Sequence, residues 1–146
     1  MPERFNLLEG KLSFDHEQEG FRWRASRLGP LLGAALIGGT VYELDAGERT
    51  FPYHFHHGEE EWLLVLSGTP GLRTPEGERT LKAGDVVCFP EGPDGAHVLR
   101  GPGRVLILSA DREPNVTEYP DSDKVKVWPP GKVFRQADAV DYWDGE

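Results

Sequence analysis

The chain has 146 residues, of which 38% are hydrophobic and 28% charged, and its formal net charge is −9. This length predicts one domain with a sizeable core. The acidic balance argues against a nucleic-acid partner, because phosphates require a basic surface. We find no apolar run long enough for a transmembrane helix and no basic-then-apolar secretory signal, so we expect no membrane association. One cysteine, Cys88, excludes an intramolecular disulfide and favours a reducing cytoplasm, and we expect it to be buried and inert.

The segments between glycines and prolines are short and rich in β-branched and aromatic residues, which predicts an all-β barrel or sandwich. We expect an arm over residues 1–33, a barrel over 34–113, and a tail over 114–146 whose aromatic residues wrap onto the barrel. A short helix is expected near residues 137–142. The expected strands, in chain order, are Ala34–Glu43, Arg49–His56, Glu61–Ser67, Gly71–Pro75, Glu78–Leu81, Val86–Pro90, Ala96–Arg100 and Val105–Ala110.

The most informative segment is Y-H-F-H-H-G-E-E-E (53–61), which holds three of the five histidines of the chain. Side chains alternate between faces along a strand, so His54 and His56 share one face and Phe55 points the other way. Glu61 has the wrong parity for an uninterrupted strand, and a turn or bulge at Gly58 would return it to the histidine face. Imidazole and carboxylate groups at this density predict a divalent metal site.

Neighbouring residues offer alternatives to these ligands. Glu61 is favoured over Glu60 because six residues then precede Gly68. His57 is expected to point outward, although it would replace His56 if the bulge fell elsewhere. A pair of hydrogen-bonded barrel histidines without a metal is the plainer interpretation of the cluster.

A second segment, A-G-D-V-V-C-F-P-E-G-P-D-G-A-H (83–97), runs from a glycine turn through an apolar strand into a Gly/Pro loop that ends at His97. A neutral histidine at this point would complete a shell of three nitrogens and one carboxylate. Such a shell leaves positions open for water or substrate. An ordinary loop histidine is the alternative. Arg73 and Arg100 are weaker candidates for binding an anion, since surface arginines are common.

These two segments carry a resemblance to the cupins. The first motif of that family is G-x5-H-x-H-x3,4-E-x6-G, and the second is G-x5-P-x-G-x2-H-x3-N. The first has six rather than five residues after its first glycine here; the second has four rather than two before the histidine, and Gly101 in place of the Asn. The chain is similar to small single-domain bacterial cupins of the conserved-barrel type over about residues 34–110. The matching residues are Gly47, His54, His56, Glu61 and Gly68, then Gly84, Pro90, Gly92 and His97.

The resemblance implies a single cupin β-barrel, a double-stranded β-helix of the jelly-roll type, with extended N- and C-terminal arms. It implies one divalent transition metal (Zn, Mn, Fe or Ni), held by His54, His56, Glu61 and His97. The expected ligand is a small organic molecule such as a sugar or keto acid, and the expected reaction is of the isomerase or dioxygenase type. The alternative is a cupin that binds its ligand without turnover and has no DNA-binding domain. A homodimer is expected, because the apolar segment Leu28–Ile37 needs covering.

Overall fold

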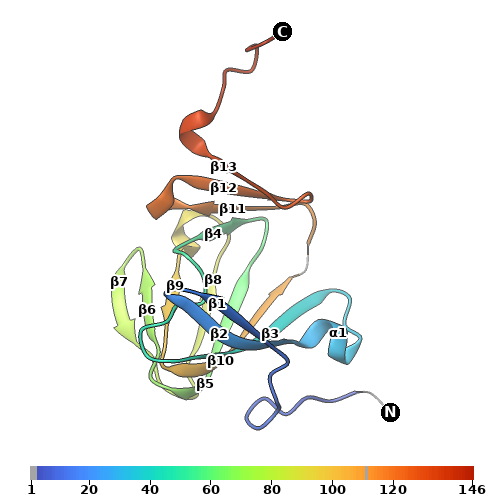
Figure 1. The fold of residues 1–146 in the computed structure, drawn as a ribbon, viewed down its shortest axis with the longest axis vertical. Helices are drawn as coiled ribbons and strands as arrows, with labels where there is room; N and C mark the ends of the chain where they lie inside the picture. Colours follow the sequence, from blue (N-terminus) through green and yellow to red (C-terminus); the bar gives the residue numbers. More distant parts are fainter. Residues whose placement is uncertain (1–2, 111) are drawn as a thin grey trace.

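The computed structural model describes residues 3–110 and 112–146, and its regular secondary structure consists almost entirely of antiparallel strands (Figure 1). The all-β expectation is therefore confirmed. The helices of the described residues are short: α1 (Leu28–Leu32) and the 3-10 helices η1 (Pro93–Gly95), η2 (Pro120–Ser122) and η3 (Gln136–Asp138). Among the described residues, no helix has the length and apolar character needed to cross a membrane.

The strands form three sheets. The largest has the order β1-β2-β3-β10-β5-β8, with the bounds β1 Phe14–Gln18, β2 Phe21–Arg27, β3 Ile37–Leu44, β10 Gly103–Ala110, β5 Glu61–Gly68 and β8 Val86–Phe89. The second has the order β7-β6-β9, with β7 Gly77–Thr80, β6 Gly71–Thr74 and β9 Val98–Arg100. The third has the order β13-β12-β11-β4, with β13 Lys132–Arg135, β12 Lys124–Trp128, β11 Asn115–Tyr119 and β4 Phe55–His57.

The core lies inside the barrel and follows the period of two along the central strands. Leu63 and Val65 of β5 and Val105 of β10 are almost fully buried in the main cluster. Leu106 of β10 faces the other way and joins a second cluster with Val41 and other residues. Strands β5 and β10 are therefore packed on both faces, which fixes the position of Glu61 at the start of β5.

The N-terminal region differs from the expected arm, because β1 and β2 extend the largest sheet through β3. Its sequence F-R-W-R-A-S-R (21–27) places Trp23 and Ala25 toward the core, while Arg22 and Arg24 alternate with them on the outer face. The period of two is therefore present in the sequence of a segment that we expected to form an arm. The homodimer remains a prediction. In the apolar segment on which it is based, Leu28–Ile37, Leu36 is 81% exposed.

The C-terminal tail also forms sheet: β11 pairs with β4, and β12 and β13 continue outward from it (Figure 1). The helix expected over 137–142 is wrong, since the helical turn there is the shorter η3. Tyr142 and Trp143 are 85% and 72% exposed instead of packing on the barrel, and the last residues extend away from the strands.

Cys88 is exposed, so the expectation that it would be buried is wrong. Strand β8 is the edge of the six-stranded sheet, and Phe89 faces the core while Cys88 faces outward beside Trp62. The run V-V-C-F suggested a buried cysteine, but only one face of this edge strand is covered.

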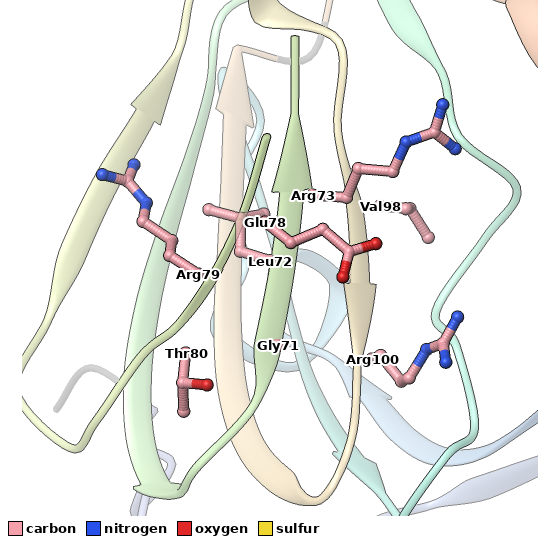
Figure 2. A pocket seen from close by; sticks show the side chains of 8 residues that line it. All are labelled: Gly71, Leu72, Arg73, Glu78, Arg79, Thr80, Val98 and Arg100. Carbon is pink, nitrogen blue, oxygen red and sulfur yellow. The ribbon is translucent and has the colours of Figure 1, made fainter. Parts of the chain in front are cut away.

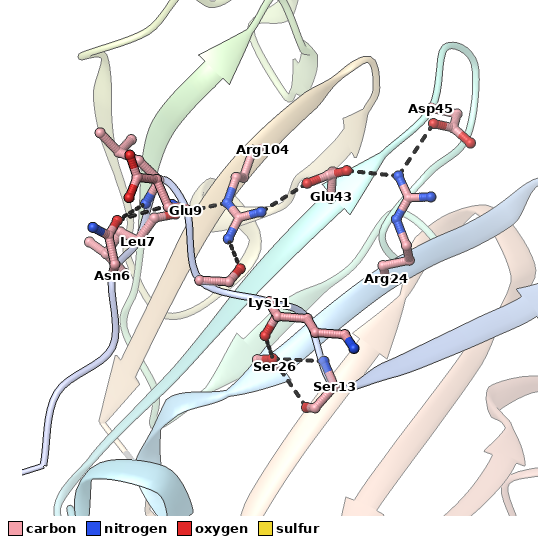
Figure 3. Close-up of polar contacts among 12 residues, drawn as sticks. Asn6, Leu7, Glu9, Lys11, Ser13, Arg24, Ser26, Glu43, Asp45 and Arg104 are labelled. Atoms are coloured by element: carbon pink, nitrogen blue, oxygen red, sulfur yellow. Dashed lines mark hydrogen bonds and ion pairs between the residues drawn. The ribbon is translucent and has the colours of Figure 1, made fainter.

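The buried guanidinium of Arg104 attaches the N-terminal segment to the barrel (Figure 3). It donates hydrogen bonds to the carbonyl oxygens of Leu7 at 2.7 Å and Gly10 at 2.6 Å. Its third contact is an ion pair with Glu43 at 2.9 Å, and the exposed Arg24 holds the same carboxylate at 2.7 Å. Removing Arg104 would leave two carbonyl groups without a donor, whereas removing Arg24 loses only a solvated ion pair.

We predict that Arg104→Ala lowers the free energy of unfolding by about 2–3 kcal/mol, because charged hydrogen bonds in a buried setting are lost. Arg24→Ala, the matched control on the same carboxylate, should stay within about 1 kcal/mol of the wild type. Urea unfolding followed by tryptophan fluorescence measures both values. Equal losses of unfolding free energy in the two variants would contradict the role of Arg104 in attaching the N-terminal segment.

Candidate metal centre

His54 and His97 lie opposite each other in an isolated antiparallel bridge. The His54 amide donates to the His97 carbonyl at 3.1 Å, and the His97 amide donates back to His54 at 2.9 Å. The two ring centroids are 4.7 Å apart. The strand expected over 49–56 is thus mostly irregular, since only Phe55–His57 is β4, but this bridge joins the two histidines of the separate motifs.

The turn at Gly58 places Glu61 on the side of His54 and His56. Gly58 has φ +76°, a left-handed conformation that favours glycine, and β5 starts at Glu61. Glu60 accepts a hydrogen bond from the Trp62 indole at 2.8 Å instead. His57 contacts Glu118 at 2.7 Å and is half exposed. The structure therefore brings Glu61 rather than Glu60, and His56 rather than His57, to the histidine cluster.

The longer loop before His97 is taken up by the 3-10 turn η1 (Pro93–Gly95). The backbone amide of Gly92 donates to the carbonyl of His56 at 2.8 Å, which ties the loop to β4. A Cβ at Gly95 would lie 1.8 Å from the Pro90 carbonyl oxygen, so this position accepts only glycine. The two additional residues therefore fold into the loop, and His97 reaches the cluster.

The three imidazoles converge on one atom, Oε2 of Glu61. Their Nε2 atoms lie 3.2 Å from it for His56, 3.4 Å for His97 and 3.9 Å for His54. His54, His56 and Glu61 also offer atoms that all lie within 4.8 Å of one another, a group able to hold a metal ion. The four residues named from the sequence are thus brought together around a single point.

The opposite ring nitrogens are held by acceptors. Nδ1 of His54 donates to the Pro52 carbonyl at 2.8 Å, and Nδ1 of His97 donates to the Gly95 carbonyl at 2.9 Å. Because a carbonyl can only accept, Nδ1 carries the hydrogen in both rings and the lone pair of each neutral ring lies on Nε2. This is the tautomer that a metal ligand requires.

Charge at the cluster also suits a cation. Burial, followed by the neighbouring His97, lowers the pKa of His54 to about 4, and burial lowers the pKa of His97. Burial opposes protonation of His56 too, but Glu61 and Glu59 outweigh it and raise the pKa of that ring. Burial alone would raise the pKa of Glu61, and the histidines, His56 foremost, bring it below its ordinary value. At neutral pH the site therefore holds an ionised carboxylate and two neutral imidazoles.

The residues present fit a bound metal ion. Oε2 of Glu61 is buried and, among the described residues, has no hydrogen-bond partner. Such an atom is costly unless something else satisfies it. Ligand atoms at about 2.0–2.2 Å from one ion are themselves roughly 3–3.5 Å apart, close to the shorter separations seen here.

The sequence did not reveal the residues behind His56. Nδ1 of His56 lies 3.2 Å from the hydroxyl of Thr117, 3.3 Å from Oδ1 of Asn115 and 3.6 Å from Glu59. Asn115 in turn donates a hydrogen bond to Glu59, and burial raises the pKa of Glu59. Two of these residues belong to β11, whose contact with β4 spans about 60 residues of chain and has no local signal.

A separate hollow of about 400 Å³ lies on the β6–β7–β9 sheet, lined by Arg73, Glu78, Arg100 and neighbouring residues (Figure 2). Arg73 holds Asp121 with two hydrogen bonds, at 2.5 and 3.0 Å, and stacks on Tyr53. Its guanidinium is therefore already engaged. This hollow is not part of the histidine cluster.

Several proteins of known structure are similar to this chain. A candidate sugar phosphate isomerase from Acidithiobacillus ferrooxidans is 26% identical, with a TM-score of 0.75 over 84% of this chain and 81% of that one. A cupin-superfamily sugar phosphate isomerase from Silicibacter pomeroyi is 21% identical, with a TM-score of 0.79 over 97% and 98%. A Cupin 2 conserved barrel domain protein from Salinispora arenicola is 24% identical, with a TM-score of 0.52 over 70% and 91%.

The comparison with curated proteins gives no match. The cupin-domain family model matches residues 40–110, the stretch that contains both histidine motifs. This match, the antiparallel barrel and the similar solved structures lead to one conclusion: residues 40–110 of the chain form a cupin domain.

Proposed function

We propose that His54, His56, Glu61 and His97 bind one divalent transition metal and that this metal centre is the active site of an isomerase for a small hydroxy-carbonyl compound. The observation that carries the proposal is the convergence of three Nε2 atoms on a buried carboxylate oxygen without a hydrogen-bond partner. The metal is Zn, Mn, Fe or Ni, since imidazole and carboxylate suit all four.

Two arguments favour isomerisation. Three histidines and one carboxylate leave coordination positions for a substrate, and a bound divalent metal supplies Lewis-acid polarisation of a carbonyl oxygen. The 26% identical protein from Acidithiobacillus ferrooxidans is described as a candidate sugar phosphate isomerase and aligns with most of this chain. A sugar or keto acid is the substrate class that combines a carbonyl with a neighbouring hydroxyl.

The residues of the chain orient the ligands and enclose the site. The Pro52 and Gly95 carbonyls fix the rings of His54 and His97. The Phe89 ring stacks on His97 with centroids 3.7 Å apart and planes 8° apart, which fixes the imidazole plane. Tyr119 lies 6.0 Å from the His54 ring and forms an aromatic wall beside it. Such apolar surroundings exclude water and strengthen the charge interactions inside.

The metal content of purified protein tests the ligand set. We predict about one transition metal ion per chain for the wild type and nearly none for His97→Ala, because one of four ligands is lost. His57→Ala, which removes a neighbouring histidine that points to Glu118, should retain full occupancy. Elemental analysis by inductively coupled plasma mass spectrometry gives both values. Full occupancy in His97→Ala would remove this residue from the shell.

The pH dependence of zinc affinity is a second test. His56 has a raised pKa and must lose its proton when the metal binds, whereas His54 and His97 have lowered pKa values and are already neutral. The affinity should therefore rise with pH up to the raised pKa of His56, with a limiting slope of about tenfold per pH unit that corresponds to one released proton, and become constant above it. Competition with a chromophoric chelator measures this slope. A slope that corresponds to two or three released protons would contradict the conclusion that only His56 is protonated before the metal binds.

Exchange of substrate hydrogen with solvent distinguishes an enzyme from a binding protein. We predict that metal-loaded protein in D₂O catalyses incorporation of deuterium beside the carbonyl of a suitable sugar or keto acid, and that metal-free protein does not. Proton NMR measures this incorporation. A ligand that raises the melting temperature of the metal-loaded protein without exchange or product would favour the non-catalytic alternative. Oxygen consumption during turnover would instead indicate a dioxygenase.

A further inference from the structure

The register of the four-stranded sheet places Lys126 on the face that carries the candidate ligand His56. Thr117 of β11 is paired directly with His56 of β4 on one side and with Lys126 of β12 on the other. Side chains of directly paired residues lie on the same face of a sheet. The hydroxyl of Thr117 contacts His56, which shows that this face is the one that adjoins the metal centre.

Lys124 occupies the neighbouring row of the same face. It is paired with Tyr119, and its ammonium nitrogen lies 5.4 Å from the centroid of the Tyr119 ring. Tyr119 in turn lies 6.0 Å from the ring of His54. Both lysines are half-buried. Both lysines therefore lie on the face of the sheet that adjoins the histidine cluster, in two adjacent rows.

Three acidic residues close to these lysines in the chain are engaged elsewhere. Glu118 faces the opposite side and contacts His57, Asp121 binds Arg73, and Asp123 accepts a hydrogen bond from the amide of Ala137. Among the described residues, neither Lys124 nor Lys126 takes part in an ion pair. Two half-buried ammonium groups without a described carboxylate partner, in a chain of net charge −9, indicate a local site for an anion.

The distance from the lysines to the ligands suits a small molecule. His56 and Lys126 are two strands apart, which corresponds to about 10 Å between backbones. The flexible four-carbon stem of a lysine lets its ammonium group approach a ligand from that distance. A compound of a few carbon atoms would therefore span the distance between the metal centre and the ammonium groups of the two lysines.

We propose that Lys124 and Lys126 bind an oxyanion group, a phosphate or a carboxylate, of a substrate whose carbonyl end lies at the metal centre. The inference rests on the proposed function for the location of the reacting end, but the anion site itself consists only of residues of β11 and β12. The substrate class becomes an anionic hydroxy-carbonyl compound rather than a neutral one. Arg73 of the other hollow does not compete for this role, because it is held by Asp121.

The test is an NMR titration of the protein with inorganic phosphate and, separately, with acetate. The backbone amide resonances of β11 and β12 report the binding. It is performed on both zinc-loaded and metal-free protein. The variants are the double substitution Lys124→Gln/Lys126→Gln and the control Lys132→Gln. Lys132 carries the same charge in the same sheet, but its pairing with Val127 places it on the opposite face.

We expect saturable shifts at residues 124–126 in the wild type and in Lys132→Gln, and about tenfold weaker binding in the double variant, since two charge-assisted contacts are lost. Binding of phosphate alone assigns a phosphorylated substrate, and comparable binding of acetate assigns a carboxylate; both support the site. No saturable binding in the wild type, equal affinity in the double variant, or equal weakening in Lys132→Gln would overturn it.

The two proposals fail separately. If zinc does not bind, the metal centre is wrong, whereas the phosphate titration of metal-free protein still decides on the lysines. If zinc binds with the expected stoichiometry and the titration fails, only the anion site is lost. Equal zinc content in the wild type and the double variant confirms that both are folded.

Discussion

The meeting of three imidazole nitrogens at one buried carboxylate oxygen is the interaction around which this barrel is arranged. An ionised carboxylate inside a protein is expensive unless it is paired or binds a metal. Glu61 is kept in this position because Leu63 and Val65, on the same face of β5, are fixed in the core. The histidines lower its pKa, but none gives its Oε2 atom a hydrogen bond of good geometry. A bound cation would satisfy this atom.

The site depends on segments that are distant in the sequence. The backbone bridge between His54 and His97 joins the two motifs, and the rigid turn at Gly95 sets the approach of His97. Strand β11, from the C-terminal region, supplies Thr117 and Asn115 behind His56. The tail is therefore part of the site rather than a cover on the outside of the barrel.

The sequence was sufficient for the candidate ligands that follow from local geometry. The period of two along a strand puts His54 and His56 together, and the left-handed conformation at Gly58 corrects the parity of Glu61. It was insufficient where a contact spans many residues, because nothing local predicts that β11 pairs with β4. The exposure of Cys88 was missed for another reason: an apolar run does not reveal that β8 is an edge strand. The alternation of Trp23 and Ala25 was visible in the sequence, but the surrounding glycines obscured it.

In the proposed arrangement the centre has two unlike sides, an acidic one formed by Glu59 and Glu61 and a basic one formed by Lys124 and Lys126 of the C-terminal sheet. Such a division suits a substrate with an anionic group at one end and a neutral carbonyl at the other, which the metal would polarise.

The proposed reaction depends on a metal ion bound by the three histidines and Glu61. The most direct test is X-ray absorption spectroscopy of the zinc-loaded protein. It should show nitrogen and oxygen ligands at about 2.0–2.2 Å with the scattering of three imidazoles, falling to two in His97→Ala reconstituted with excess zinc. A shell without imidazole scattering, or one unchanged in His97→Ala, would contradict the account.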